Sequence, residues 1–157
     1  MLSPGDRAPD FHGTLADGRQ LRLRDFRGRR HVILYFFPKD FTPGCTKEAC
    51  GFRDNYDAIA AYDAVIVGVS GDSEGSHASF REKYDLPFPL IADPDKELLT
   101  KYDARGGLLA FMPPRVTYVI DKEGVIRAAM RHDLFVGRHV GEVLEALASF
   151  ASPAATA

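Results

Sequence analysis

The sequence is short of cysteine, of long apolar runs and of any excess of one charge. It has two cysteines, Cys45 and Cys50, whereas a thiolate metal site normally needs four ligands. No apolar run approaches the length that spans a bilayer, and the N-terminus lacks the charged and apolar regions of a secretory signal. A formal net charge of −2 gives no drive towards nucleic acid or an anionic membrane. We therefore expect a cytoplasmic protein, in which two cysteines are more often catalytic than structural.

The length and composition favour one folded domain. A chain of 157 residues can bury its own core, and 45% hydrophobic with 27% charged residues is ordinary for a soluble protein. No repeat or low-complexity tract interrupts the chain before its last residues. We predict a single domain over residues 1–151 and a frayed tail over residues 152–157.

The hydrophobic pattern predicts an α/β protein with a mixed central sheet flanked by helices on both faces. An Asp-Gly turn within residues 15–21 indicates an N-terminal β-hairpin. Strands are expected at residues 31–37, 64–70, 90–92, 115–120 and 125–131. Helices are expected from residue 43 onward and over residues 75–84, 93–102 and 138–150. Residues 105–114 are expected to form a Gly- and Pro-containing loop, and Phe41 and Phe111 are expected near any pocket there.

The stretch from Pro38 to Cys50 places a thiol at the start of a helix. Pro38 ends the strand, Thr42 is predicted as the N-cap, and Pro43 suits the first helical position. Cys45 then falls in the first turn, where backbone N–H groups lack intrahelical partners and the helix dipole favours an anion. A thiol there ionises more easily than a free cysteine, whose pKa is about 8.5. The same N–H groups suit an oxygen-rich ligand, which points to peroxide chemistry.

The second cysteine is out of reach while the helix is intact. Five helical residues separate the Cα atoms of Cys45 and Cys50 by roughly 8.6 Å. This distance exceeds the roughly 7 Å beyond which a disulfide needs backbone movement. The helical periodicity directs Cys45 inward and Cys50 towards a more polar face. A bond between them would form only when the first turn unwinds, which suits a catalytic cycle.

These motifs resemble those of a known family. Pro38-x-x-x-Thr42-x-x-Cys45 resembles the active-site motif of the peroxiredoxins. Cys45-Thr-Lys-Glu-Ala-Cys50 is similar to the subgroup called bacterioferritin comigratory protein, or peroxiredoxin Q. The resemblance extends from residues 5–11 to residues 115–121 and covers nearly the whole chain. It implies a thioredoxin-like fold with an N-terminal extension, and no metal, haem or flavin.

The resemblance also implies a reaction. Cys45 would reduce hydrogen peroxide and organic hydroperoxides and become a sulfenic acid. Cys50 would resolve it as an intramolecular disulfide, which thioredoxin or a glutaredoxin-like donor would reduce. A resolving cysteine in the same chain removes the need for a dimer, so a monomer is expected. The residues alone leave open that Cys50 is a bystander, with a small thiol or another protein resolving Cys45.

The resemblance assigns further roles around the sulfur. Arg115 is implied as the active-site arginine, which would stabilise the thiolate and hold a peroxide oxygen. Glu48, three residues after Cys45, would orient that arginine. Pro38 would shield the sulfur from water, and the amide of Gly44 would join Thr42 in contacting the peroxide. From the residues alone, Arg115 could instead be a strand-end arginine that faces solvent.

The sequence is compatible with two other functions. One alternative is a thiol–disulfide oxidoreductase, which would usually carry Cys-x-x-Cys. The other is a redox-sensing or interaction domain, in which Cys45 would react only slowly with peroxide. The five histidines show no close pairing and are interpreted as surface or packing residues. The arginines at 22, 24, 27, 29 and 30 are interpreted as a solvated face rather than a partner site.

Overall fold

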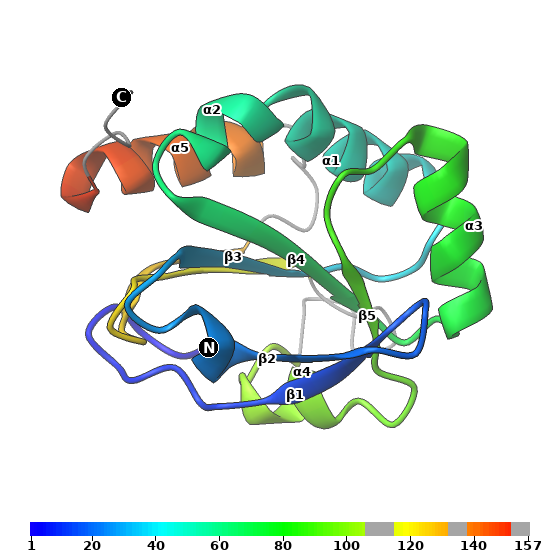
Figure 1. Ribbon diagram of the computed structural model, residues 1–157, viewed down its shortest axis with the longest axis horizontal. Helices are drawn as coiled ribbons and strands as arrows, with labels where there is room; N and C mark the ends of the chain where they lie inside the picture. Colours follow the sequence, from blue (N-terminus) through cyan, green and yellow to red (C-terminus); the bar gives the residue numbers. More distant parts are fainter. Residues whose placement is uncertain (106–114, 132–137, 152–157) are drawn as a thin grey trace.

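A seven-stranded mixed sheet lies between helices in the computed structural model (Figure 1), which describes residues 1–105, 115–131 and 138–151. The strands are β1 (His12–Leu15), β2 (Gln20–Arg22), β3 (His31–Phe36), β4 (Ala64–Ser70), β5 (Leu90–Ala92), β6 (Val116–Ile120) and β7 (Ile126–Arg131). The helices are η1 (Leu23–Phe26), α1 (Pro43–Asp54), α2 (Tyr56–Ala60), α3 (Glu74–Tyr84), α4 (Glu97–Lys101) and α5 (Arg138–Phe150).

The strand order β2-β1-β5-β4-β3-β6-β7 puts β3 near the middle of the sheet. β3 pairs in parallel with β4, and β4 pairs in parallel with β5. β6 runs antiparallel to β3, with Val116 opposite Phe36. The start of β6 therefore lies at the edge of the sheet where β3 and β4 end, and loops at that edge can meet.

Both faces of β3 are buried, which explains its unbroken apolar sequence. Successive side chains of a strand alternate between the faces of a sheet. Ile33 and Tyr35 pack in the core cluster that includes residues of α1, α3 and α5. Leu34 and Phe36 pack in the opposite cluster, which includes Leu98 of α4.

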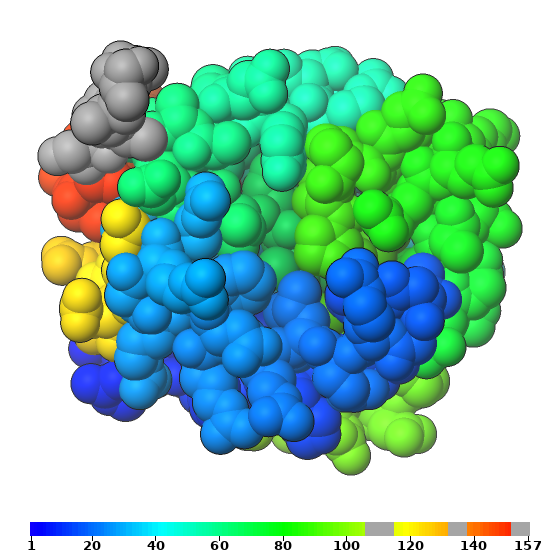
Figure 2. Space-filling model, in the orientation of Figure 1, coloured from blue at the N-terminus to red at the C-terminus, as the bar shows by residue number. Residues whose placement is uncertain are grey.

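The helices divide between the two faces. α1, α2 and α5 cover one face of the sheet, and α4 lies on the other (Figure 1). The hairpin joins the sheet because Thr14 and Leu15 of β1 pair with β5. Figure 2 shows these blue N-terminal residues packed beside the green residues of α3 and β5. Within the described segments, no helix combines the length and apolar character that crossing a membrane requires.

The predicted architecture is confirmed, including the mixed sheet, the hairpin and the helix over residues 138–150. The helix predicted from residue 43 onward is divided in two, since α1 ends at Asp54 and α2 begins at Tyr56. The arginines at 22, 24, 27, 29 and 30 are exposed, as the interpretation of a solvated face requires. The predicted loop at residues 106–114, with Phe111, and the predicted tail at residues 152–157 lie outside the described residues.

Candidate active site

The first turn of α1 buries the predicted nucleophile. Cys45 is 1% exposed and packs in the core cluster with Tyr35 and Ala49. The N–H of Thr46 is bonded to the carbonyl of Thr42 at 2.8 Å, the first intrahelical bond. The preceding amides have no acceptor within the helix, and the positive end of its dipole lies there. An anionic sulfur at Cys45 is therefore stabilised by its position.

Thr42 is the N-cap residue of α1, as predicted, but its hydroxyl does not cap the helix, so that part of the prediction is wrong. Thr42 has the extended backbone of an N-cap residue, but it makes no side-chain cap bond within the described part of the chain. Its Oγ1 donates instead to the carbonyl of Lys39 at 2.8 Å. The intervening Phe41 has a φ of 66°, and this turn brings that carbonyl within reach of the hydroxyl. The amides at the start of α1 are thus left uncapped by Thr42.

Arg115 lies against the sulfur, not in solvent. It immediately precedes β6, which the pairing with β3 places beside the start of α1. Its Nη1 donates to the Sγ of Cys45 at 3.1 Å, and the residue is 8% exposed. The guanidinium also lies close to Gly44: a Cβ built there would be 2.6 Å from Nη2. A glycine at this position lets the guanidinium approach the helix start.

Two further buried groups lie behind the guanidinium. Glu48, one turn after Cys45, places Oε1 4.0 Å from Nη1 of Arg115. The other oxygen of Glu48 is hydrogen-bonded to Nδ1 of His139, at the start of α5, and both side chains are fully buried. The same Nδ1 lies 3.3 Å from the hydroxyl of Thr117 in β6. Groups from α1, β6 and α5 thus converge behind the sulfur.

Cys50 lies farther along the same unbroken helix. It is half-buried, and both cysteines are free thiols. Because α1 is continuous from Pro43 to Asp54, the two sulfurs cannot bond without unwinding of the turns between them. Pro38, half-buried, follows the last residues of β3 as predicted and begins the loop that leads into α1.

The structure therefore brings together Cys45, Gly44, Arg115 and Glu48, as expected. Histidines were expected to be surface or packing residues, and this missed the partnership of His139 with Glu48. The two residues are 91 positions apart, and no local pattern links them. A signal was available only in the helical periodicity at residues 138–150, which places residue 139 beside the inward Val140 and Val143.

A guanidinium held against a buried sulfur stabilises a thiolate, and amides beside that sulfur suit a substrate with an O–O bond. The fold and the site define a thioredoxin-like protein whose reactive group is a cysteine thiol. The sequence pattern of the AhpC/TSA family matches residues 4–129, which make up most of the chain. The chain belongs to the AhpC/TSA family.

The relatives place the chain within that family. It is 40% identical over 148 residues to peroxiredoxin Q, chloroplastic, of Oryza sativa subsp. japonica, covering 94% of this chain and 68% of the rice protein. It is 41% identical over 148 residues to peroxiredoxin Bcp of Bacillus subtilis (strain 168), covering 91% of this chain and 93% of that protein.

Solved structures agree with this placement. Peroxidoxin BcpB of Mycobacterium tuberculosis superposes with a TM-score of 0.88 at 30% identity, covering 97% of this chain and 100% of that one. A Xanthomonas campestris bacterioferritin comigratory protein, whose structure was studied for alkyl peroxide reduction, has a TM-score of 0.80 at 32% identity, covering 88% and 90%. The protein is thus a thiol-dependent peroxidase of the peroxiredoxin Q/Bcp group, with peroxide substrates and a thiol reductant.

Proposed function

We propose that Cys45 is the peroxide-attacking residue and that Arg115 activates it. The observation that carries this proposal is the 3.1 Å contact between Nη1 of Arg115 and Sγ of Cys45, both buried. A buried guanidinium beside a thiol favours the charged thiolate, which is the nucleophilic form. Glu48 supports the arrangement because its carboxylate faces the same guanidinium.

In the first step, the Cys45 thiolate attacks the terminal oxygen of ROOH and the O–O bond breaks. The products are a sulfenic acid on Cys45 and, after uptake of a proton, ROH. Negative charge moves from the sulfur to the departing oxygen during this step. The Arg115 guanidinium and the amides of Gly44 and Cys45 are fixed donors for that charge, so they stabilise the transition state without reorganising. We assign to Thr42 a hydrogen bond to the substrate and to Pro38 the shielding of the sulfur from water, as the resemblance to the peroxiredoxins implies.

In the second step, the thiol of Cys50 attacks the sulfenic acid. A disulfide between Cys45 and Cys50 forms and water leaves. The step requires the first turns of α1 to unwind, since the intact helix holds the two residues too far apart. An external dithiol then reduces the disulfide by thiol exchange and is itself oxidised.

We propose thioredoxin or a glutaredoxin-like protein as the dithiol, and organic hydroperoxides beside hydrogen peroxide as substrates. The alkyl peroxide reduction studied in the Xanthomonas campestris relative supports the second. We also propose a monomer, because an intrachain resolving cysteine removes the need for a dimer, and light scattering of the reduced and oxidised protein tests this. A cytoplasmic location stays a prediction, and the plant relatives are named as chloroplastic.

Stopped-flow oxidation by hydrogen peroxide tests the two cysteine roles. We expect Cys45→Ser to lose rapid peroxide consumption entirely. The matched variant Cys50→Ser should still consume one equivalent of peroxide at the normal rate, but it should not turn over with thioredoxin. Mass spectrometry of the oxidised natural chain should show an intrachain Cys45–Cys50 crosslink. Full turnover by Cys45→Ser would contradict the proposal.

A further inference from the structure

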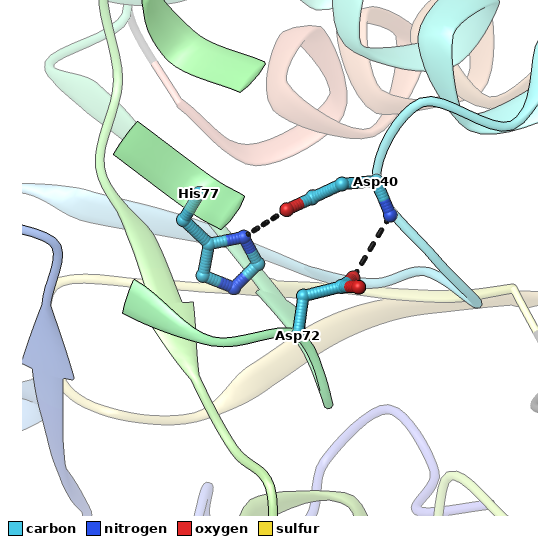
Figure 3. Close-up of side chains that lie close together, drawn as sticks. All are labelled: Asp40, Asp72 and His77. Atoms are coloured by element: carbon cyan, nitrogen blue, oxygen red, sulfur yellow. Dashed lines mark hydrogen bonds and ion pairs between the residues drawn. The ribbon is translucent and has the colours of Figure 1, made fainter. Parts of the chain in front are cut away.

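A second buried acid–histidine cluster lies beside the loop that leads into α1 (Figure 3). We call residues 38–42, between β3 and α1, the active-site loop. Lys39 and Phe41 of this loop are exposed, but Asp40 between them is 3% exposed. A carboxylate turned inward from a surface loop needs strong partners, because burying a charge is unfavourable without them.

Asp40 has partners through both its side chain and its backbone. Its Oδ2 accepts a hydrogen bond from the hydroxyl of Ser76 at 2.8 Å and lies 2.7 Å from Nδ1 of His77. Its N–H donates to Oδ2 of Asp72 at 2.8 Å. Figure 3 shows the side chain of Asp40 directed at His77 and its backbone nitrogen directed at Asp72. The remaining ring nitrogen of His77 lies 3.0 Å from the carbonyl oxygen of Ile91 in β5.

These partners make Asp40 and His77 a buried, hydrogen-bonded acid–histidine pair. A carbonyl oxygen only accepts hydrogen bonds, so Nε2 of His77 carries a proton. Nδ1 lies 2.7 Å from Oδ2 of Asp40, so one proton is shared between the ring and the carboxyl group. The two side chains are 0% and 1% exposed. Removing one member of the pair leaves the other polar side chain buried without its hydrogen-bond partner, which is destabilising for the local structure.

Asp72 is held in place from β4. Its Oδ2 accepts a hydrogen bond from the hydroxyl of Ser70 at 2.6 Å, and its own N–H donates back to that oxygen at 3.2 Å. Ser70 is the last residue of β4. The active-site loop is thereby tied to β4 through Asp72, to α3 through His77, and to β5 through the Ile91 carbonyl. Oδ2 of Asp40 and Oδ2 of Asp72 are each engaged by N–H or O–H groups, whereas Oδ1 of Asp40 is buried without a hydrogen-bond partner among the described residues.

The loop conformation depends on such contacts. Phe41 has a φ of 66°, in the left-handed region that residues with a Cβ rarely adopt. Its ring is 43% exposed and meets Phe80 of α3 edge-on at 5.1 Å between centroids. Conformations of this kind persist only where the surroundings hold them. Asp40 is the neighbouring residue, so its contacts are well placed to hold the turn.

We propose that Asp40 and His77 form a latch that holds the active-site loop, and with it the first turn of α1, in the folded arrangement where Cys45 meets Arg115. The inference rests on the proposed function, in which that turn must unwind before Cys50 can reach Cys45. Asp40 and His77 are positioning residues, since they act on Cys45 through the loop.

The latch sets a competition at the oxidised sulfur. While the turn is folded, the Cys45 sulfenic acid can react with a second ROOH, giving a sulfinic acid and ROH. Once the turn unwinds, Cys50 converts the sulfenic acid into a disulfide and releases water. A firm latch prolongs the folded state and favours the sulfinic acid, whereas a weakened latch favours the disulfide.

The test measures both outcomes in Asp40→Ala and Ser76→Ala. The peroxide concentration that converts half of Cys45 into sulfinic acid during turnover is read by mass spectrometry. For Asp40→Ala we expect this concentration and the rate of disulfide formation each to rise about tenfold, from loss of a charge-assisted hydrogen bond. Ser76→Ala removes one bond to the same carboxylate and should raise both by about two- to fivefold. The initial oxidation of Cys45 should slow by about threefold or less, because the folded state remains predominant.

His12→Ala is the matched control, since His12 is an exposed histidine of β1 outside the cluster. It should leave both quantities unchanged. A role in general stability alone would lower the melting temperature without moving the ratio of disulfide to sulfinic acid. An unchanged ratio in folded Asp40→Ala overturns the latch. If Asp40→Ala does not fold, an unchanged ratio of disulfide to sulfinic acid in Ser76→Ala overturns the latch instead.

The two proposals fail differently. Turnover by Cys45→Ser would remove the proposed chemistry itself. If Cys45 is required but the latch variants match His12→Ala, the chemistry stands and the latch alone is wrong.

Discussion

Two buried acid–histidine pairs flank the reactive cysteine, and they differ in what the acid touches besides its histidine. Glu48, paired with His139, faces the guanidinium of Arg115 at 4.0 Å. Asp40, paired with His77, instead fixes the backbone of the active-site loop through its N–H bond to Asp72. The first pair therefore acts on the charges around the sulfur, and the second acts on the conformation that presents it. Two similar acid–histidine pairs thus have different roles: Glu48–His139 affects the reactivity of Cys45, and Asp40–His77 affects the conformation of the active-site loop.

The two pairs share one low-dielectric interior. Tyr35 of β3 is fully buried, and burial raises its pKa well above the ordinary value. The negative charges of Glu48, Cys45 and Asp40 act on the pKa of Tyr35 in the same direction. Because polar groups interact more strongly in such surroundings than in water, each acid needs a hydrogen-bonded partner to remain buried.

The largest expected effect comes from the residue that the first pair supports. Replacing Arg115 with methionine removes a fixed donor to the sulfur and to the departing oxygen. We expect the second-order rate constant for peroxide to fall by about 100- to 1000-fold, measured by stopped-flow. Arg24→Met, at an exposed arginine of η1, should match the natural chain. A loss below about tenfold would show that Arg115 does not act on the oxygens.

A smaller change tests whether the position of the guanidinium matters. In Gly44→Ala the new Cβ would lie 2.6 Å from Nη2 of Arg115, so the guanidinium must shift. Displacements of this size reduce rates by up to about 100-fold, and we expect a loss between about tenfold and that limit. Gly141→Ala in α5 is the matched control, since its Cβ meets no described atom within 4 Å. The control should keep full activity and gain about 0.5–1 kcal/mol of stability.

The comparison of the two pairs is tested directly by His139→Ala and His77→Ala. We expect His139→Ala to slow the first oxidation about tenfold, because Glu48 loses its partner and no longer holds Arg115 in place. His77→Ala should mainly accelerate disulfide formation. The double variant should show both effects independently, to within about a factor of two. Strong coupling between the two substitutions, measured by a double-mutant cycle of both rates, would mean that the pairs act as one unit.

The smallest effect on activity is expected at a buried carboxylate that belongs to neither pair. Asp121, in the turn between β6 and β7, accepts hydrogen bonds from the N–H groups of Glu123 and Val125 and from Arg127. Burial acts to raise the pKa of Asp121, but these donors outweigh it and the pKa lies below its ordinary value. Its contribution to stability is therefore complete at neutral pH and disappears as the pH falls through the lowered folded-state pKa.

The corresponding variant, Asp121→Asn, should lose about 1–2 kcal/mol of unfolding free energy at pH 7 and keep full peroxidase activity. Calorimetry should show that its melting temperature falls less steeply on acidification below about pH 4 than that of the natural chain. Equal acid sensitivity of the two proteins would contradict the assignment of the ionised carboxylate to this turn.

Much of the architecture could be predicted because its signals are local. The apolar run before Pro38, the Thr-Pro start of α1 and the Asp-Gly turn each need only neighbouring residues. The strands at β4 and β6 and the helix α5 follow from periodicity in the same way. The hydroxyl of Thr42 was mispredicted because its partner, the Lys39 carbonyl, is selected by the unusual φ of Phe41. The residue types of that loop do not predict a positive φ at Phe41.

The order of residues along the chain determined that a thiol would stand at the start of a helix, with its mate five positions away. It did not determine what surrounds that thiol. Arg115 reaches Cys45 across 70 positions because β6 pairs antiparallel with β3. His139 and His77 find their carboxylates across 91 and 37 positions. Side chains so distant meet only once the sheet has aligned its strand ends, so the electrostatics of the site belong to the tertiary structure.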